Sequence, residues 1–137
     1  MRKYLYIILF SFLVSTNSFA GLFDKNKIKV SKCYDVKQKS LREYKKKYPG
    51  FKWEADINLK DDTVVITVID NGKVSLFRTM INMKTDRFIG TYALEPVGTV
   101  HVFDMKKESV TQRNDNWDDT MAEIMGGRET ILKCKFS

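Results

Sequence analysis

KWEADINLKDDTVVITVIDNGKVSLFRTMI, residues 52–81, carries the clearest structural pattern of this chain. Its first eight residues alternate apolar and polar side chains, which is typical of a half-buried β-strand. Residues 63–69 are only Thr, Val and Ile, a composition that favours a central strand. Asn71 and Gly72 separate this run from another strand-like run, 74–81. Asn-Gly between two such runs predicts a tight hairpin, because both turn positions need positive φ.

The chain beyond this hairpin continues in short strand-like segments joined by polar turns. Parallel neighbours need a long crossover, so short turns favour antiparallel pairing. We therefore expect an antiparallel meander of about six strands. The sequence leaves open whether this sheet curls or closes into a barrel. The additional segments with strand character are 87–94, 97–103, 108–113 and 128–136.

Two segments have helical character. Residues 35–48, DVKQKSLREYKKKY, predict an N-terminal helix with Asp35 as its cap and a stop at Pro49-Gly50. Thr120 and Glu123 have capping-box spacing, which predicts a short helical turn before the last strand. The expected fold class is α+β, with one N-terminal helix packed on the meander.

The first twenty residues, MRKYLYIILFSFLVSTNSFA, have the layout of a secretory signal peptide. Arg2 and Lys3 precede an apolar run that is shorter than the roughly 20 residues of a membrane-spanning helix. We expect cleavage after Ala20 and one small domain, 21–137, with no later membrane segment. Cleavage removes two basic residues and no acidic one, so the net charge falls from +7 to +5. The predicted destination is the periplasm or the cell exterior.

Cys33 and Cys134 are the only two cysteines of the chain, and they lie near the two ends of the predicted domain. In an oxidising compartment such a pair favours a disulfide. A redox or metal pair is disfavoured because the chain has no C-x-x-C motif and only one histidine. The bridge would hold the segment before the helix against the last strand.

The predicted helix is strongly basic, with only Glu43 opposing its positive charges. Such a patch attracts anionic polymers, lipid headgroups or acidic proteins, although a solvated helix face has the same composition. Nucleic acid is disfavoured as a partner by the expected export. The candidate anion-binding residues are Lys37, Lys39, Arg42, Lys45, Lys46 and Lys47.

The polar loop 114–119 contains Trp117 beside several acidic residues. An aromatic side chain in a polar loop is a candidate anchor for a protein partner. The loop fails the EF-hand pattern, and its acids are also suited to capping the next helix, so calcium binding stays open. The candidate partner-contact residues are Trp117, Asp115, Asp118 and Asp119.

Catalytic motifs are not found in the sequence. It contains no G-x-S-x-G, S-x-x-K or H-E-x-x-H pattern. His101 shares a strand face with Thr99 and Phe103, and we expect it to be a surface or partly packed residue. We therefore predict no enzymatic activity, no cofactor and no metal.

These features together favour a small, exported, disulfide-clamped binding protein, with a protein partner of the kind that inhibitor or immunity proteins have. One alternative is an envelope protein that binds an anionic polymer or lipid through residues 37–47. A second alternative is a carrier that holds an apolar ligand inside a curled sheet. The sequence does not identify the partner or the oligomeric state.

Overall fold

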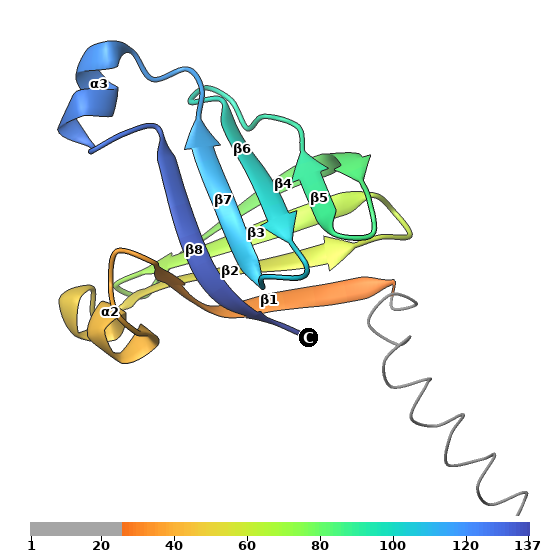
Figure 1. The fold of residues 1–137 in the computed structure, drawn as a ribbon, viewed down its shortest axis with the longest axis horizontal. Coiled ribbons are helices and arrows are strands. Elements are labelled where there is room, and N and C mark those ends of the chain that lie inside the picture. Colours follow the sequence, from red (N-terminus) through yellow and green to blue (C-terminus); the bar gives the residue numbers. More distant parts are fainter. Residues whose placement is uncertain (1–25) are drawn as a thin grey trace, which may run out of the picture.

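The computed structural model describes residues 26–137. They form a closed antiparallel barrel in which each strand pairs with the next and β8 pairs with β1 (Figure 1). The strands are β1 (Lys27–Asp35), β2 (Phe51–Asn58), β3 (Thr63–Asp70), β4 (Lys73–Lys84), β5 (Phe88–Thr91), β6 (Thr99–Asp104), β7 (Ser109–Asn114) and β8 (Glu129–Phe136). The helices are α2 (Leu41–Lys47) and α3 (Asp119–Ile124). The predicted signal peptide, 1–20, lies outside the described residues.

The prediction of an α+β fold with an N-terminal helix packed on about six strands is wrong. The described chain begins with β1, in which Ile28 and Val30 are buried and Lys27 and Lys29 are exposed. The alternation then breaks at a bulge near Lys32, which has a φ of +53°. The bulge brings Cys33 to the inner face although it is three residues after Val30. This interruption hides the period of two over the first strand.

The helix predicted for 35–48 is shorter than expected. Asp35 ends β1, and its side chain accepts the backbone N–H of Lys37 in the following turn. The N-cap of α2 is Ser40, whose hydroxyl accepts the N–H of Glu43. Tyr44 is the buried residue of this helix. The helix therefore lies at one end of the barrel instead of covering a sheet face (Figure 1).

The core lies inside the barrel and follows the alternation that the sequence shows. Trp53, Ala55 and Ile57 of β2 are buried, as are Val64 and Ile66 of β3. In an antiparallel pair, directly opposite residues share one face of the sheet. The register of β2 and β3 pairs Ala55 with Ile66 and Ile57 with Val64, so the two inward rows meet.

The predicted hairpin and the predicted disulfide are both present. Asn71 and Gly72 have φ values of +50° and +84° and connect β3 to β4. Cys33 of β1 and Cys134 of β8 are bonded, with an S–S distance of 2.06 Å. The bond therefore holds the two strands that close the barrel. A disulfide of this kind is compatible with an exported protein.

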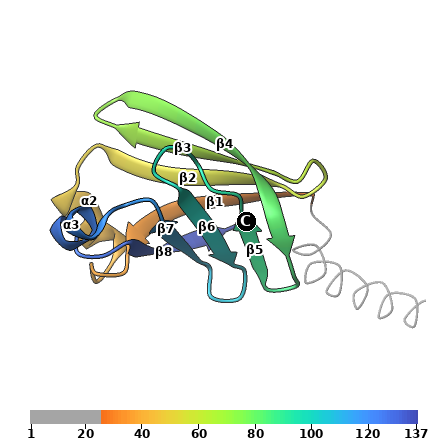
Figure 2. The same cartoon turned by 90° about the horizontal axis from the view of Figure 1, so that it is seen from above.

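β4 has twelve residues and its neighbour β5 has four. The two strands pair only between Ile81–Lys84 and residues 89–91. The predicted strand 87–94 thus stops at Thr91, and the chain leaves the sheet before the cis bond between Glu95 and Pro96. Figure 2 shows the β3–β4 hairpin reaching past β5. Neither helix between residues 26 and 137 is long and apolar enough to cross a membrane.

Candidate functional site

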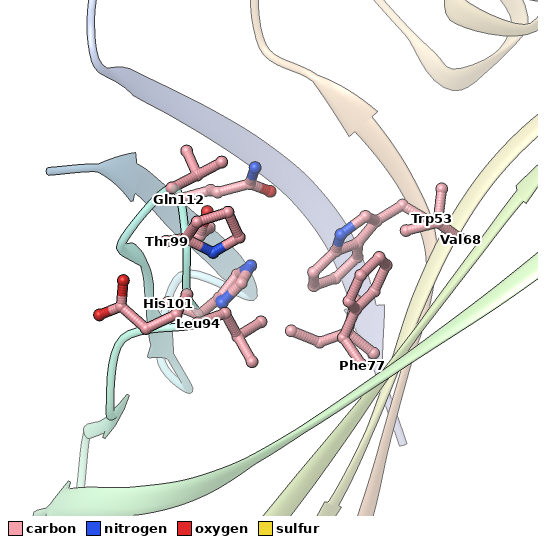
Figure 3. Close-up of a pocket in the computed structure, with 11 residues that line it drawn as sticks. Trp53, Val68, Phe77, Leu94, Thr99, His101 and Gln112 are labelled. Carbon is pink, nitrogen blue, oxygen red and sulfur yellow. The ribbon is translucent and has the colours of Figure 1, made fainter. Parts of the chain in front are cut away.

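An apolar pocket of about 260 Å³ opens beside the first part of β4, where β5 does not pair with it. Its walls come from the inward faces of β2–β4 and of β6–β7, and from the connection between β5 and β6 (Figure 3). The apolar lining residues are Trp53, Ile66, Val68, Phe77, Leu94, Pro96 and Val97, and the polar ones are Glu95, Thr99, His101 and Gln112.

The local sequence explains the aromatic wall. Trp53 occupies an inward position in the alternation of β2 and is 6% exposed. Phe77 is opposite Ile66 in the β3–β4 register and therefore also faces inward. Phe77 is nevertheless 44% exposed, because β5 does not extend beside it. It consequently stands at the mouth of the pocket, while Trp53 lies deeper.

His101 faces this wall from β6 (Figure 3). Its ring centroid lies 5.8 Å from that of Trp53 and 6.4 Å from that of Phe103. The residue is 2% exposed, so the expectation of a surface or partly packed histidine is wrong. Its Nδ1 atom is buried and has no hydrogen-bond partner among residues 26–137. Such an atom is costly to leave unpaired, because burial removes the water that would otherwise satisfy it.

Burial lowers the pKa of His101 from 6.5 to about 4, and a hydrogen bond with the Gln112 side chain acts in the opposite direction. The ring is therefore neutral at pH 7. A neutral imidazole has one nitrogen that donates and one that accepts. Nδ1 is the ring nitrogen that has no partner in either role. His101, which lines the pocket, thus has a buried ring nitrogen without a hydrogen-bond partner.

This shift makes stability depend on pH. Between about 6.5 and 4 the unfolded state binds a proton at His101 and the folded state does not, so acid favours unfolding. We expect the free energy of unfolding to fall by up to about 3 kcal/mol over that window. Urea unfolding at several pH values measures it. His101→Gln, which does not titrate, should flatten the curve; an unchanged slope in this variant would contradict the assignment.

A second group with a shifted pKa, the carboxyl of Asp104, has a structural role. The Arg87 guanidinium donates to both of its carboxylate oxygens, at 3.2 and 3.0 Å, and lowers the pKa of Asp104 to about 2. This pair joins the end of β6 to the turn before β5, away from the pocket lining. The protonation of Asp104 therefore affects stability at a lower pH than the protonation of His101 does.

The predicted basic residues lie outside the pocket lining. Lys37 and Lys39 belong to the turn before α2, and the other four lie on the helix. All six are exposed. Lys47 places its Nζ 5.6 Å from the ring centroid of Tyr48. Anion binding by this surface stays a prediction.

The acidic residues predicted to contact a partner each have a local partner within the chain. Asp115 accepts from Arg113 at 2.6 Å, and Asp119 accepts from Arg128 at 2.9 Å. The N-cap of α3 is Asp118, whose carboxylate accepts the N–H of Met121. These bonds hold the loop and the helix. In the described part of the chain, no three His, Cys, Asp or Glu side chains form a group that could hold a metal ion.

Trp117 is half-buried, and its carbonyl accepts from the Arg128 guanidinium at 3.1 Å. None of the residues predicted from the sequence as binding sites lines the pocket. The sequence signal for the pocket was that Trp53 and His101 both occupy inward-facing positions in the alternation of their strands. The two side chains meet only when the sheet closes into a barrel. No family model, no curated protein and no solved structure matches this chain.

Proposed function

We propose that this protein binds one small, flat, mostly apolar molecule in the barrel pocket. The observation that carries the proposal is the buried, unpartnered Nδ1 of His101 within an aromatic pocket. Barrels of eight strands have an interior that side chains fill or that holds one small ligand. The disulfide supports a site of action in the periplasm or outside the cell. The proposed role is binding and carrying, without catalysis.

The pocket chemistry narrows the class of ligand. A volume of about 260 Å³ lies below the usual range for drug-sized ligands, which favours a compound of one or two rings. The aromatic rings of Trp53 and Phe77 favour a flat partner. We take Nδ1 as the accepting nitrogen of the neutral ring, so the ligand should supply a hydroxyl or a ring N–H. Glu95 on the lining disfavours an anion, which leaves a neutral phenol-like or indole-like molecule.

The probe 1-naphthol tests this assignment against naphthalene, which has the same rings without the hydroxyl. We expect 1-naphthol to bind at least fivefold more tightly, because only it can satisfy Nδ1. Titration followed by two-dimensional amide NMR should place the shifts at β2, β4 and β6. Trp53→Ala should weaken binding at least tenfold through loss of the deeper wall.

Trp117→Ala is the matched control, since it removes the other tryptophan and leaves the pocket lining intact. It should bind 1-naphthol as the parent protein does. Equal affinities for the two probes would show that Nδ1 of His101 accepts no hydrogen bond from the ligand. The proposal itself fails if 1-naphthol produces no shifts at the pocket, or if both tryptophan variants bind alike.

The exposed apolar side chains of α3 favour a second candidate, a protein partner of the kind predicted for inhibitor or immunity proteins. Met121 and Ile124 of α3 and its C-cap Met125 are 44%, 72% and 55% exposed. Contiguous apolar side chains on a small helix are typical of a contact surface. Trp117→Ala separates the two candidates, because it alters the loop before α3 and spares the pocket.

A further inference from the structure

The first half of β4 forms an open sheet edge. β4 is paired with β3 along residues 73–80, but on its other side the pairing with β5 begins only at Ile81. Outside the strand pairing, Tyr92 donates its N–H to the Met80 carbonyl and accepts from the Thr79 hydroxyl at 2.9 Å. On that side no backbone hydrogen bond is found for residues 73–79 within the described chain. An unpaired edge of this kind is a template for another strand.

The register identifies which backbone groups face outward. Ile81 donates its N–H to Asp62 of the turn before β3, whereas the carbonyl of Met80 points the other way, toward Tyr92. Backbone groups alternate in direction along an antiparallel strand. The N–H and carbonyl groups of Val74, Leu76 and Arg78 therefore point away from β3.

The same residues have outward side chains with apolar character. Val74 is 57% exposed and Leu76 is 67% exposed. Both lie on the barrel exterior, because the intervening Ser75 and Phe77 are opposite Val68 and Ile66 of the inner face. Natural edges are usually protected by charge, proline or a bulge. Between Val74 and Phe77 this edge carries none of these.

We propose that the β4 edge pairs with the β4 edge of a second copy of this chain, antiparallel across a two-fold axis at Ser75. In this register Val74 lies opposite Leu76 of the second copy, and Leu76 opposite Val74. Each such pair exchanges both backbone hydrogen bonds. The surface is its own complement, as a two-fold interface requires.

The length of the open edge and its charges fit this register. Arg78 falls opposite Gly72, where the second chain turns away, so the new strand ends before Met80 and its bond to Tyr92. Lys73 falls opposite Phe77, and no two residues of like charge are paired. Moving the axis from Ser75 to Leu76 would place Val74 opposite Arg78 and bring the second hairpin against Tyr92. The Ser75 register therefore favours a second copy over an unrelated strand.

Disulfide trapping tests the register. Across the axis the two Ser75 residues form a pair without hydrogen bonds, with about 4.5 Å between Cα atoms, which a disulfide accepts. Ser75→Cys should give a covalent dimer as the main species after mild oxidation. Met80→Cys is the matched control on the same strand, because its two copies would lie roughly 30 Å apart. Monomeric Ser75→Cys, or equal cross-linking of both variants, would overturn the proposal.

Sedimentation of the unmodified chain supplies an independent measurement. Leu76→Pro removes an outward N–H and leaves the β3 pairing intact, a substitution that edge strands tolerate. It should raise the dissociation constant of the dimer at least tenfold, with the Cys33–Cys134 bond and thermal melting as checks of folding. Leu76→Thr, which keeps the N–H, should have a smaller effect.

Ionic strength gives a further criterion. Both copies are positively charged, so salt should strengthen the dimer by screening their repulsion. A dimer that salt weakens would indicate an ionic contact elsewhere and would overturn the edge pairing. A chain that sediments as a monomer up to about millimolar concentration would overturn it as well. Neither outcome depends on a ligand in the pocket.

Discussion

Replacement of both Cys33 and Cys134 by alanine should lower the free energy of unfolding by about 4–5 kcal/mol. The bond joins residues 101 positions apart, so it removes the closure entropy of a long loop from the unfolded chain. It also lies at the β1–β8 seam, where the register is broken by the bulge between Ser31 and Tyr34. Urea unfolding monitored by circular dichroism gives the difference.

Reduction provides the control for this prediction. With dithiothreitol present, the parent chain should become about as unstable as the double variant, because both then lack the cross-link. The substitution itself removes little volume, so packing should contribute little to the loss. A difference that persists in full after reduction would show that the alanines disturb packing and that the bond contributes little.

Phe103→Ala should lower the free energy of unfolding by about 3–5 kcal/mol. Phe103 is 0% exposed and lies between the rings of His101 and Phe136, with centroid distances of 6.4 Å to each. Its removal leaves a cavity that a closed barrel has little freedom to fill. Chemical denaturation of the variant and the parent protein measures the loss.

Phe77→Ala is the matched comparison, because the same atoms are removed from a ring that is 44% exposed. We expect it to cost less than half as much, since less area leaves water when this residue folds. It should weaken 1-naphthol binding instead. Equal losses of stability for the two variants would contradict the assignment of Phe103 to the core and Phe77 to the mouth.

The strands with regular alternation were predictable from the sequence. On β2 and β8 the inward residues follow a period of two without interruption, and the structure buries Trp53, Ala55, Leu132 and Phe136. β1 escaped prediction because the bulge near Lys32 changes its phase halfway. Alternation of apolar and polar residues identifies a strand only where no bulge changes which residues face inward.

Closure and the pocket could not be predicted in the same way. Whether β8 meets β1 depends on the accumulated twist of eight strands, which no single segment encodes. The burial of His101 follows from that closure, since it brings β2 and β6 to opposite walls of one interior. The sequence pattern of β6 shows only that one face of this strand carries Thr99, His101 and Phe103. It does not show which residues pack against that face.

The order of the strands also has a consequence for folding kinetics. Among the strands between residues 26 and 137, every pairing but one joins neighbours in the chain, and the exception is β1 with β8. Local hairpins close quickly, whereas a contact across about 100 residues must first overcome the entropy of a long loop. The barrel should therefore form one hairpin after another, and the pairing of β1 with β8 should form late. A chain refolding with its disulfide intact begins with those two distant strands tethered, so refolding should be much slower once the bond is reduced.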